Sequence, residues 1–114
     1  MNTLHKDPAK VARAIMPAKH VGGVYDGLGS YQWRKRGGHA GRTQIVRSLE
    51  KASALGFVRG KFATTGTPDG SYMGGTEVYS HPDGWELTYH TSYGCVAHDN
   101  SFSMSLKQIK KDAS

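Results

Sequence analysis

The residues best suited to chemistry in this sequence lie together between Tyr31 and Arg42. Two rings, Tyr31 and Trp33, stand next to three consecutive cations at positions 34–36, and several glycines follow. Aromatic rings stack on bases, guanidinium groups pair with phosphates in a forked geometry, and glycines let the backbone approach a ligand closely. This combination predicts a nucleic-acid contact. The predicted contact residues are Tyr31, Trp33, Arg34, Lys35, Arg36, His39, Arg42 and Arg47.

The start of the helix expected after this segment offers a second anion contact. The free N–H groups and the positive dipole end near Gly38–Thr43 favour a phosphate. Two nucleotide-binding patterns are excluded. Gly27 and Gly29 lack the third glycine of a dinucleotide fingerprint, and residues 37–42 lack the Gly-Lys-Ser/Thr of a P-loop. A basic loop whose rings are tucked into the core is the alternative interpretation.

The charge is distributed unevenly along the 114 residues, whose net charge is +6. Residues 1–60 hold eleven Lys or Arg against three Asp or Glu, whereas residues 61–106 hold one lysine against five acidic residues. Clustered cations predict one face that binds a polyanion, because phosphate contacts draw on Lys and Arg. Composition alone also fits a basic protein without such a ligand.

No histidine or cysteine spacing is diagnostic of catalysis or of metal binding. The second half contains His81, His90 and His98, but it has no His-x-His pair, no zinc-protease pattern and no paired cysteines. We therefore expect no catalytic residue, no metal and no cofactor. An RNA-cleaving enzyme that uses His81 or His90 as a general acid or base is the alternative.

Tyrosines in the second half predict a different kind of site. Exposed aromatic side chains on an acidic rim are typical of a protein-docking patch. Such a patch would suit a small inhibitor or adaptor, although core packing also explains large residues in a strand. The possible docking residues are Tyr72, Tyr79, Tyr89 and Tyr93, with Met73 and Trp85 beside them.

Two helices are expected in the first half of the chain. Asp7 and Pro8 are typical of a helix start, and Pro17 ends that helix. A second helix is predicted from Gly41 to Leu55 because its apolar residues recur at helical spacing and a glycine follows. The glycines between His20 and Gly41 predict a loop with room for one short strand at residues 21–25.

The second half has the pattern of antiparallel strands. Strands are predicted at Phe57–Thr65, Ser71–Ser80 and Trp85–Tyr93, separated by two Pro-Asp-Gly turns. A fourth would carry Phe102, Met104 and Leu106 on one face. The predicted fold is therefore α+β: two N-terminal helices joined by a Gly-rich basic loop, then an antiparallel meander of three or four strands. We expect one domain over residues 1–114, with residues 1–6 and 111–114 flexible.

The composition also indicates in which cellular compartment the protein is expected. Apolar runs are far shorter than the roughly 20 residues that cross a bilayer, and the first residues lack the apolar stretch of a signal peptide. The lone cysteine, Cys95, has no internal partner for a disulfide, which fits a reducing compartment. A cytoplasmic protein is expected, with no membrane partner.

Residues 42–57 resemble a known DNA-binding arrangement. Their Leu-Glu-Lys-Ala-Ser-Ala-Leu-Gly-Phe-Val ending is similar to the recognition helix and first wing strand of winged-helix domains. The resemblance implies a wing at Gly66–Gly75 and contacts in the major groove. The sequence departs from the family in having one helix instead of two before the recognition helix.

A second resemblance covers roughly the last seventy residues. Ile45 to Phe57, then residues 78–84 and 105–109, follow the layout of the double-stranded-RNA-binding-like toxins of the HicA type. That layout implies a final helix and a histidine that cleaves RNA. Where the family has Gly-Ser-His, this sequence has Gly75, Thr76 and Glu77, so the catalytic histidine has no counterpart.

The sequence thus favours a non-catalytic nucleic-acid-binding accessory or regulatory protein whose partner is DNA or RNA. An inhibitor or adaptor that docks on another protein, through its basic face or its tyrosines, is the second hypothesis. An RNase-like toxin is the third.

Overall fold

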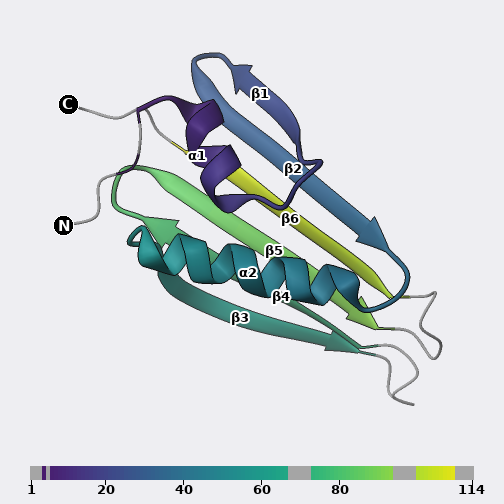
Figure 1. Cartoon of the computed structure of the whole chain (residues 1–114). Helices are drawn as coiled ribbons and strands as arrows, with labels where there is room; N and C mark the ends of the chain where they lie inside the picture. The colour runs from purple at the N-terminus through teal and green to yellow at the C-terminus, as the bar shows by residue number, and fades with distance from the viewer. Residues whose placement is uncertain (1–3, 5, 67–72, 94–99, 110–114) are drawn as a thin grey trace.

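The computed structural model of the chain is shown in Figure 1. It describes residues 4, 6–66, 73–93 and 100–109, with side chains at all of these positions except 61–66, 73 and 93. Within them the chain forms two helices and one antiparallel sheet of six strands. The elements along the chain are α1 (Pro8–Ile15), β1 (Val21–Tyr25), β2 (Leu28–Arg36), α2 (Ala40–Ala54), β3 (Val58–Gly66), β4 (Met73–His81), β5 (Trp85–Tyr93) and β6 (Ser101–Gln108).

The predicted Gly-rich loop between the helices is wrong, because that segment is a β-hairpin, although the short strand expected at residues 21–25 is present as β1. Asp26 (φ 53°) and Gly27 (φ 80°) form the two-residue turn between β1 and β2. Asp-Gly is a strong hairpin signal, since both turn positions need a positive φ. β2 also alternates, with Tyr31 and Trp33 buried and Gln32 exposed. Counting glycines as helix breakers concealed a period-2 strand.

The predicted meander of three or four strands is also wrong, although the α+β class holds. The strand order is β1-β2-β6-β5-β4-β3. Strands β3 to β6 do form a meander, but the hairpin joins it because β2 pairs with β6. Tyr31 lies opposite Leu106 and Trp33 opposite Met104. This pairing converts a small meander into a sheet of six strands.

Neither family resemblance fits this topology. The winged-helix layout has no place for a six-stranded sheet, and the HicA-type layout implies a helix where the chain forms β6. Both resemblances start from α2 and the strand after it. That helix-strand pair occurs in many folds, so it does not determine how the remaining strands are arranged.

Both helices pack on the same face of the sheet (Figure 1). As predicted, Asp7 begins α1, and its side chain accepts a hydrogen bond of 3.0 Å from the N–H of Ala9. From α2, Ile45 and Ala52 are buried against the sheet. Beneath the helices the main buried side chains of the sheet are Tyr31, Trp33, Trp85, Leu87, Phe102, Met104 and Leu106.

The predicted turn at residues 81–84 is confirmed, and His81 has a structural role there. The N–H of Gly84 donates to the carbonyl of His81 at 3.0 Å. The N–H of Asp83 donates to Nδ1 of His81, so Nε2 carries the proton and donates to the carbonyl of Leu55 at 2.9 Å. The buried ring thereby ties the end of α2 to the β4–β5 turn. The other predicted Pro-Asp-Gly turn lies outside the described residues.

A substitution at Gly41 tests how closely α2 approaches the sheet. A Cβ at this position would lie 2.4 Å from the ring of Phe102. Helix propensity alone would make Gly41→Ala stabilising by up to about 1 kcal/mol. Because the overlap forces the buried Phe102 to move, we expect a net loss of about 1–3 kcal/mol in the free energy of unfolding. Urea denaturation measures it, with Ser53→Ala on the exposed side of α2 as the control; a stabilised Gly41→Ala variant would contradict the packing.

Candidate functional site

No element among the described residues covers the side of the sheet turned away from the helices, although Ser92 at one end of it is only 2% exposed. Successive strand residues point to opposite faces, so Arg34 and Arg36 of β2 point to the side opposite Tyr31 and Trp33. We call this side the open face. Most of its residues on β2, β6, β5 and β4 are polar or small: Ser30, Gln32, Arg34 and Arg36 on β2, Ser101, Ser103, Ser105 and Lys107 on β6, Glu86, Thr88, His90 and Ser92 on β5, and Gly74, Thr76 and Ser80 on β4. Apolar side chains on this face are Val21 and Tyr25 of β1, Leu28 of β2 and Val78 of β4.

The strand register arranges these side chains in rows that run across the sheet. One row joins Thr76, His90, Ser103 and Arg34 through direct cross-strand partners. Directly opposed residues on neighbouring strands lie about 5 Å apart, close enough for their side chains to contact one ligand. The row thus places a guanidinium group, an imidazole and two hydroxyl groups along one line.

A hollow of about 170 Å³ lies over this row. Its lining includes Arg34, His90 and Ser103, with Gln32, Thr88 and Ser105 from the next row and Trp33, Tyr89 and Met104 between the two rows. Its polar side chains are those that can bind a ligand. These groups supply one fixed positive charge together with hydroxyl and amide hydrogen-bond donors. Such a lining suits a single anionic oxygen group, such as a phosphate or a carboxylate.

His90 is held in place by hydroxyl groups. Its Nδ1 lies 2.7 Å from Oγ1 of Thr76, and its Nε2 lies 3.3 Å from Oγ of Ser92. Both ring nitrogens are therefore engaged inside the row, which fixes the plane of the ring. These hydrogen bonds position the ring. Neither nitrogen can exchange a proton with a ligand unless one of the bonds breaks.

The open face carries more positive than negative charge. Its one described carboxylate, Glu86, lies 3.9 Å from the ammonium group of Lys107. Arg34 and Arg36 are exposed at the other end of the strands. A further hollow of about 160 Å³ reaches from Arg34 to Lys19. On the open face, the positive charge is therefore concentrated around β2.

The predicted contact residues are divided between the two sides of the sheet. Arg34 and Arg36 lie on the open face, whereas Tyr31 and Trp33 are only 4% and 5% exposed beneath the helices. The structure does not bring these rings to the surface that carries Arg34 and Arg36. The strand alternation explains this separation, because neighbours in sequence point to opposite sides.

The remaining predicted contacts lie on the helix side. Arg42 and Arg47 are exposed on α2, and Lys35 points by strand parity toward the helices. His39 precedes α2 but makes no capping hydrogen bond from its side chain. Its Nδ1 is 3.4 Å from the amide nitrogen of Asn100, which also donates to the carbonyl of Gly38 at 3.0 Å. Asn100 thus fixes the turn between β2 and α2.

The tyrosines predicted to form a docking patch lie toward the helix side where they are described. Tyr79 is 8% exposed, and Tyr89 is half-buried against the core. Trp85, expected beside them, is also buried. Tyr72 lies outside the described residues, as do the side chains of Met73 and Tyr93.

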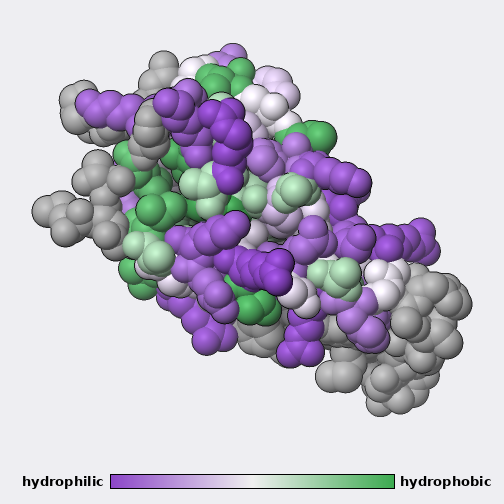
Figure 2. Space-filling view, viewed as in Figure 1, coloured by the Kyte–Doolittle hydropathy of each residue, from purple (hydrophilic) through white to green (hydrophobic). Residues whose placement is uncertain are grey.

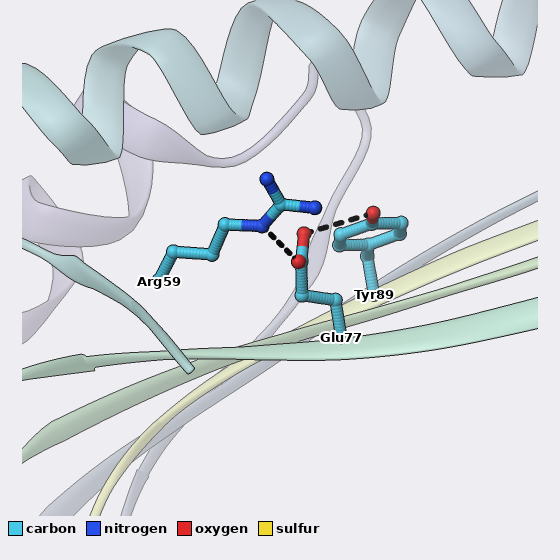
Figure 3. Close-up of polar contacts among 3 residues, drawn as sticks. All are labelled: Arg59, Glu77 and Tyr89. Carbon is cyan, nitrogen blue, oxygen red and sulfur yellow. Dashed lines mark hydrogen bonds and ion pairs between the residues drawn. The ribbon is translucent and has the colours of Figure 1, made fainter. Parts of the chain in front are cut away.

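A second polar cluster surrounds Glu77, which is 1% exposed beneath α2 (Figure 3). Its carboxylate accepts a hydrogen bond from Nε of Arg59 and another of 3.0 Å from the hydroxyl of Tyr89. Burial, and then the hydrogen bond to Glu77, raise the pKa of Tyr89 to about 12. The cluster neutralises a buried charge, and its polar atoms already bond one another. We assign it to stability.

Sequence reasoning missed the polar residues of the open face. Ser103, Ser105, Gln32 and Thr88 carry no motif, because a serine or threonine in a strand is ordinarily a solvent-facing position. The available signal was the alternation at 101–106, where serines alternate with Phe102, Met104 and Leu106. Recognising β2 as the partner of β6 would have placed them beside Arg34.

Two further findings concern metals and membranes. The described residues contain no group of three or more His, Cys, Asp or Glu side chains that could hold a metal ion. In the same part of the chain, neither helix has the length and apolar character needed to span a bilayer. His98 lies outside these residues.

The Glu77 cluster gives a prediction about stability. Arg59→Met should lower the urea midpoint, because it leaves a buried carboxylate without its cation. Adding Glu77→Gln removes that charge, so the double variant should be more stable than Arg59→Met alone. Urea titrations followed by circular dichroism measure both. A double variant that is less stable than either single variant would show that the charge pairing is not what matters.

Comparison with protein-family models, with curated proteins and with solved structures finds no match to this chain.

Proposed function

We propose that the chain is a non-catalytic nucleic-acid-binding protein of accessory or regulatory type, acting in the cytoplasm, and that it contacts its ligand through the open face. The observation that carries the proposal is the placement of Arg34 and Arg36 on an uncovered, hydroxyl-rich sheet surface beside the hollow. Phosphate groups are the ligands that guanidinium and hydroxyl donors recognise together.

The spacing of the cations supports contacts to a chain of phosphates. Arg34 and Arg36 are two residues apart on one strand, so their Cα atoms are about 7 Å apart on the same side of the sheet. The hollow beside Arg36, of about 460 Å³, includes Ser101 and Ser103 in its lining. A polyanion that follows β2 can thus meet both guanidinium groups and the neighbouring hydroxyl groups.

The proposed binding is directed mainly at the backbone of the nucleic acid. The rings expected to stack on bases, Tyr31 and Trp33, are buried. Phosphate contacts position a nucleic acid without reading its sequence. We therefore expect weak sequence preference and an affinity that falls steeply with salt.

The non-catalytic part of the proposal is supported by the histidines. His81 uses both ring nitrogens to hold the turn at residues 81–84, and His90 is held by Thr76 and Ser92. A general acid or base needs a nitrogen that can reach the substrate. RNA incubated with the protein should remain intact.

The test compares two double variants that remove the same charge from opposite sides of the sheet. In Arg34→Ala/Arg36→Ala the open face loses two guanidinium groups, whereas Arg42→Ala/Arg47→Ala removes two from α2. We expect the first to lower the slope of log affinity against log salt by about 1.5, the share of two phosphate contacts. The second should leave the slope nearly unchanged.

Fluorescence anisotropy with labelled single-stranded RNA, single-stranded DNA and duplex DNA measures these slopes. An equal loss in both variants would place the contact elsewhere or make it a long-range charge effect. Absence of binding to all three ligands at low salt would contradict the proposal. RNA cleavage that His90→Ala abolishes would replace it with the RNase hypothesis.

A further inference from the structure

The two edges of the sheet differ in how they are protected from pairing with another strand. On the β3 edge the sequence has Arg59 and Lys61, and the register shifts between Arg59 and Phe62 as in a β-bulge. Charged residues and bulges are the usual means by which a protein blocks edge pairing. The β1 edge reads Val-Gly-Gly-Val-Tyr, with no charge and no proline. Among the described residues, the β1 edge therefore lacks the features that block pairing at the β3 edge.

The unblocked edge is also apolar on both sides. The side chains of Val21 and Tyr25 are 70% and 62% exposed on the open face, and Val24 is 52% exposed on the helix side. Figure 2, which shows the helix side, has hydrophobic surface at this margin, next to hydrophilic residues. Strand pairing at this edge would bury these side chains and satisfy the free backbone groups of β1.

We propose that β1 pairs antiparallel with β1 of a second copy of this chain, with the two-fold axis at Gly23. In this register Val21 lies opposite the partner's Tyr25, and Gly22 lies opposite the partner's Val24. An aromatic residue opposite a β-branched residue is a favourable cross-strand pair. Gly23 of one protomer lies opposite Gly23 of the other at the axis, so no side chains clash there.

Charge complementarity selects a second copy as the occupant. The exposed Lys19 precedes β1, and the exposed Asp26 follows it. Antiparallel pairing about Gly23 brings the Asp26 turn of one protomer beside Lys19 and His20 of its partner. Two-fold symmetry repeats this contact, so the interface has two complementary pairs. They offset part of the repulsion between chains of net charge +6.

The dimer would join two sheets into one. Arg34 and Arg36 of both protomers would then lie on a single continuous open face. Dimerisation itself does not depend on nucleic-acid binding, so it is tested with no nucleic acid present. Its failure would leave the proposed function of the monomer standing.

Disulfide trapping tests the register. A Cβ at Gly23 has the hydroxyl of Tyr25 at 3.9 Å as its nearest neighbour, so cysteine fits there. Opposed residues in an antiparallel pair have Cα atoms about 4.5–5.5 Å apart, within the range of a disulfide. In a Cys95→Ser background, Gly23→Cys should give a covalent dimer on mild oxidation, while Val58→Cys on the β3 edge should stay monomeric. Equal cross-linking of the two variants, or none, would overturn the proposal.

Sedimentation of proteins without added cysteines tests the interaction itself. Val24→Lys places a cation in the proposed interface and should weaken dimerisation by roughly tenfold or more. Val58→Lys changes a valine that is 64% exposed on the opposite edge, and it should leave dimerisation unchanged. Asp26→Asn keeps a residue that tolerates the positive φ and should weaken the dimer at low salt. A wild-type chain that remains monomeric, or a Val24→Lys variant that dimerises like the wild type, would rule the interface out.

Discussion

The pairing of β2 with β6 is the constraint on which the rest of the structure depends. It joins two segments that are about seventy positions apart in the chain, with Tyr31 opposite Leu106 and Trp33 opposite Met104. A shift of one residue would turn these rings to the open face and bury Arg34, at the cost of an unpaired buried charge. The same register therefore fixes the core and the position of the cations.

The abundance of glycine has a packing explanation in this fold. At Gly29 a Cβ would lie 2.8 Å from Cβ of Pro8, and at Gly41 it would overlap the ring of Phe102. One site lets α1 approach the sheet, and the other lets α2 do so. Gly27 instead supplies a positive φ in the hairpin turn. Glycines that indicate a loop in the sequence thus allow the helices to pack closely on the sheet.

These distinctions explain what could be predicted from sequence. α1, α2 and β5 were predicted because each has a periodic apolar pattern and a clear cap or turn, as at Asp7. β2 was missed because the glycines between His20 and Gly41 favour a loop, and its partner lies at the far end of the chain. The cations of the candidate site were found by residue type, but which side they face depends on pairing that no local pattern reveals.

Among the described residues, the acidic side chains of the second half affect the open face less than their number implies. Glu77 is buried on the helix side against Arg59, and Glu86 lies beside Lys107. Asp83 belongs to the β4–β5 turn, at the opposite end of the strands from Arg36. A paired or distant carboxylate weakens a neighbouring cation far less than a free one at contact distance, because charge interactions decline with separation and screening. Among the described residues, the positive charge around Arg34 and Arg36 therefore has no carboxylate at close range on its own face. The positive charge that is concentrated in the first half of the sequence therefore lies, on the open face, toward the Arg36 end of the strands.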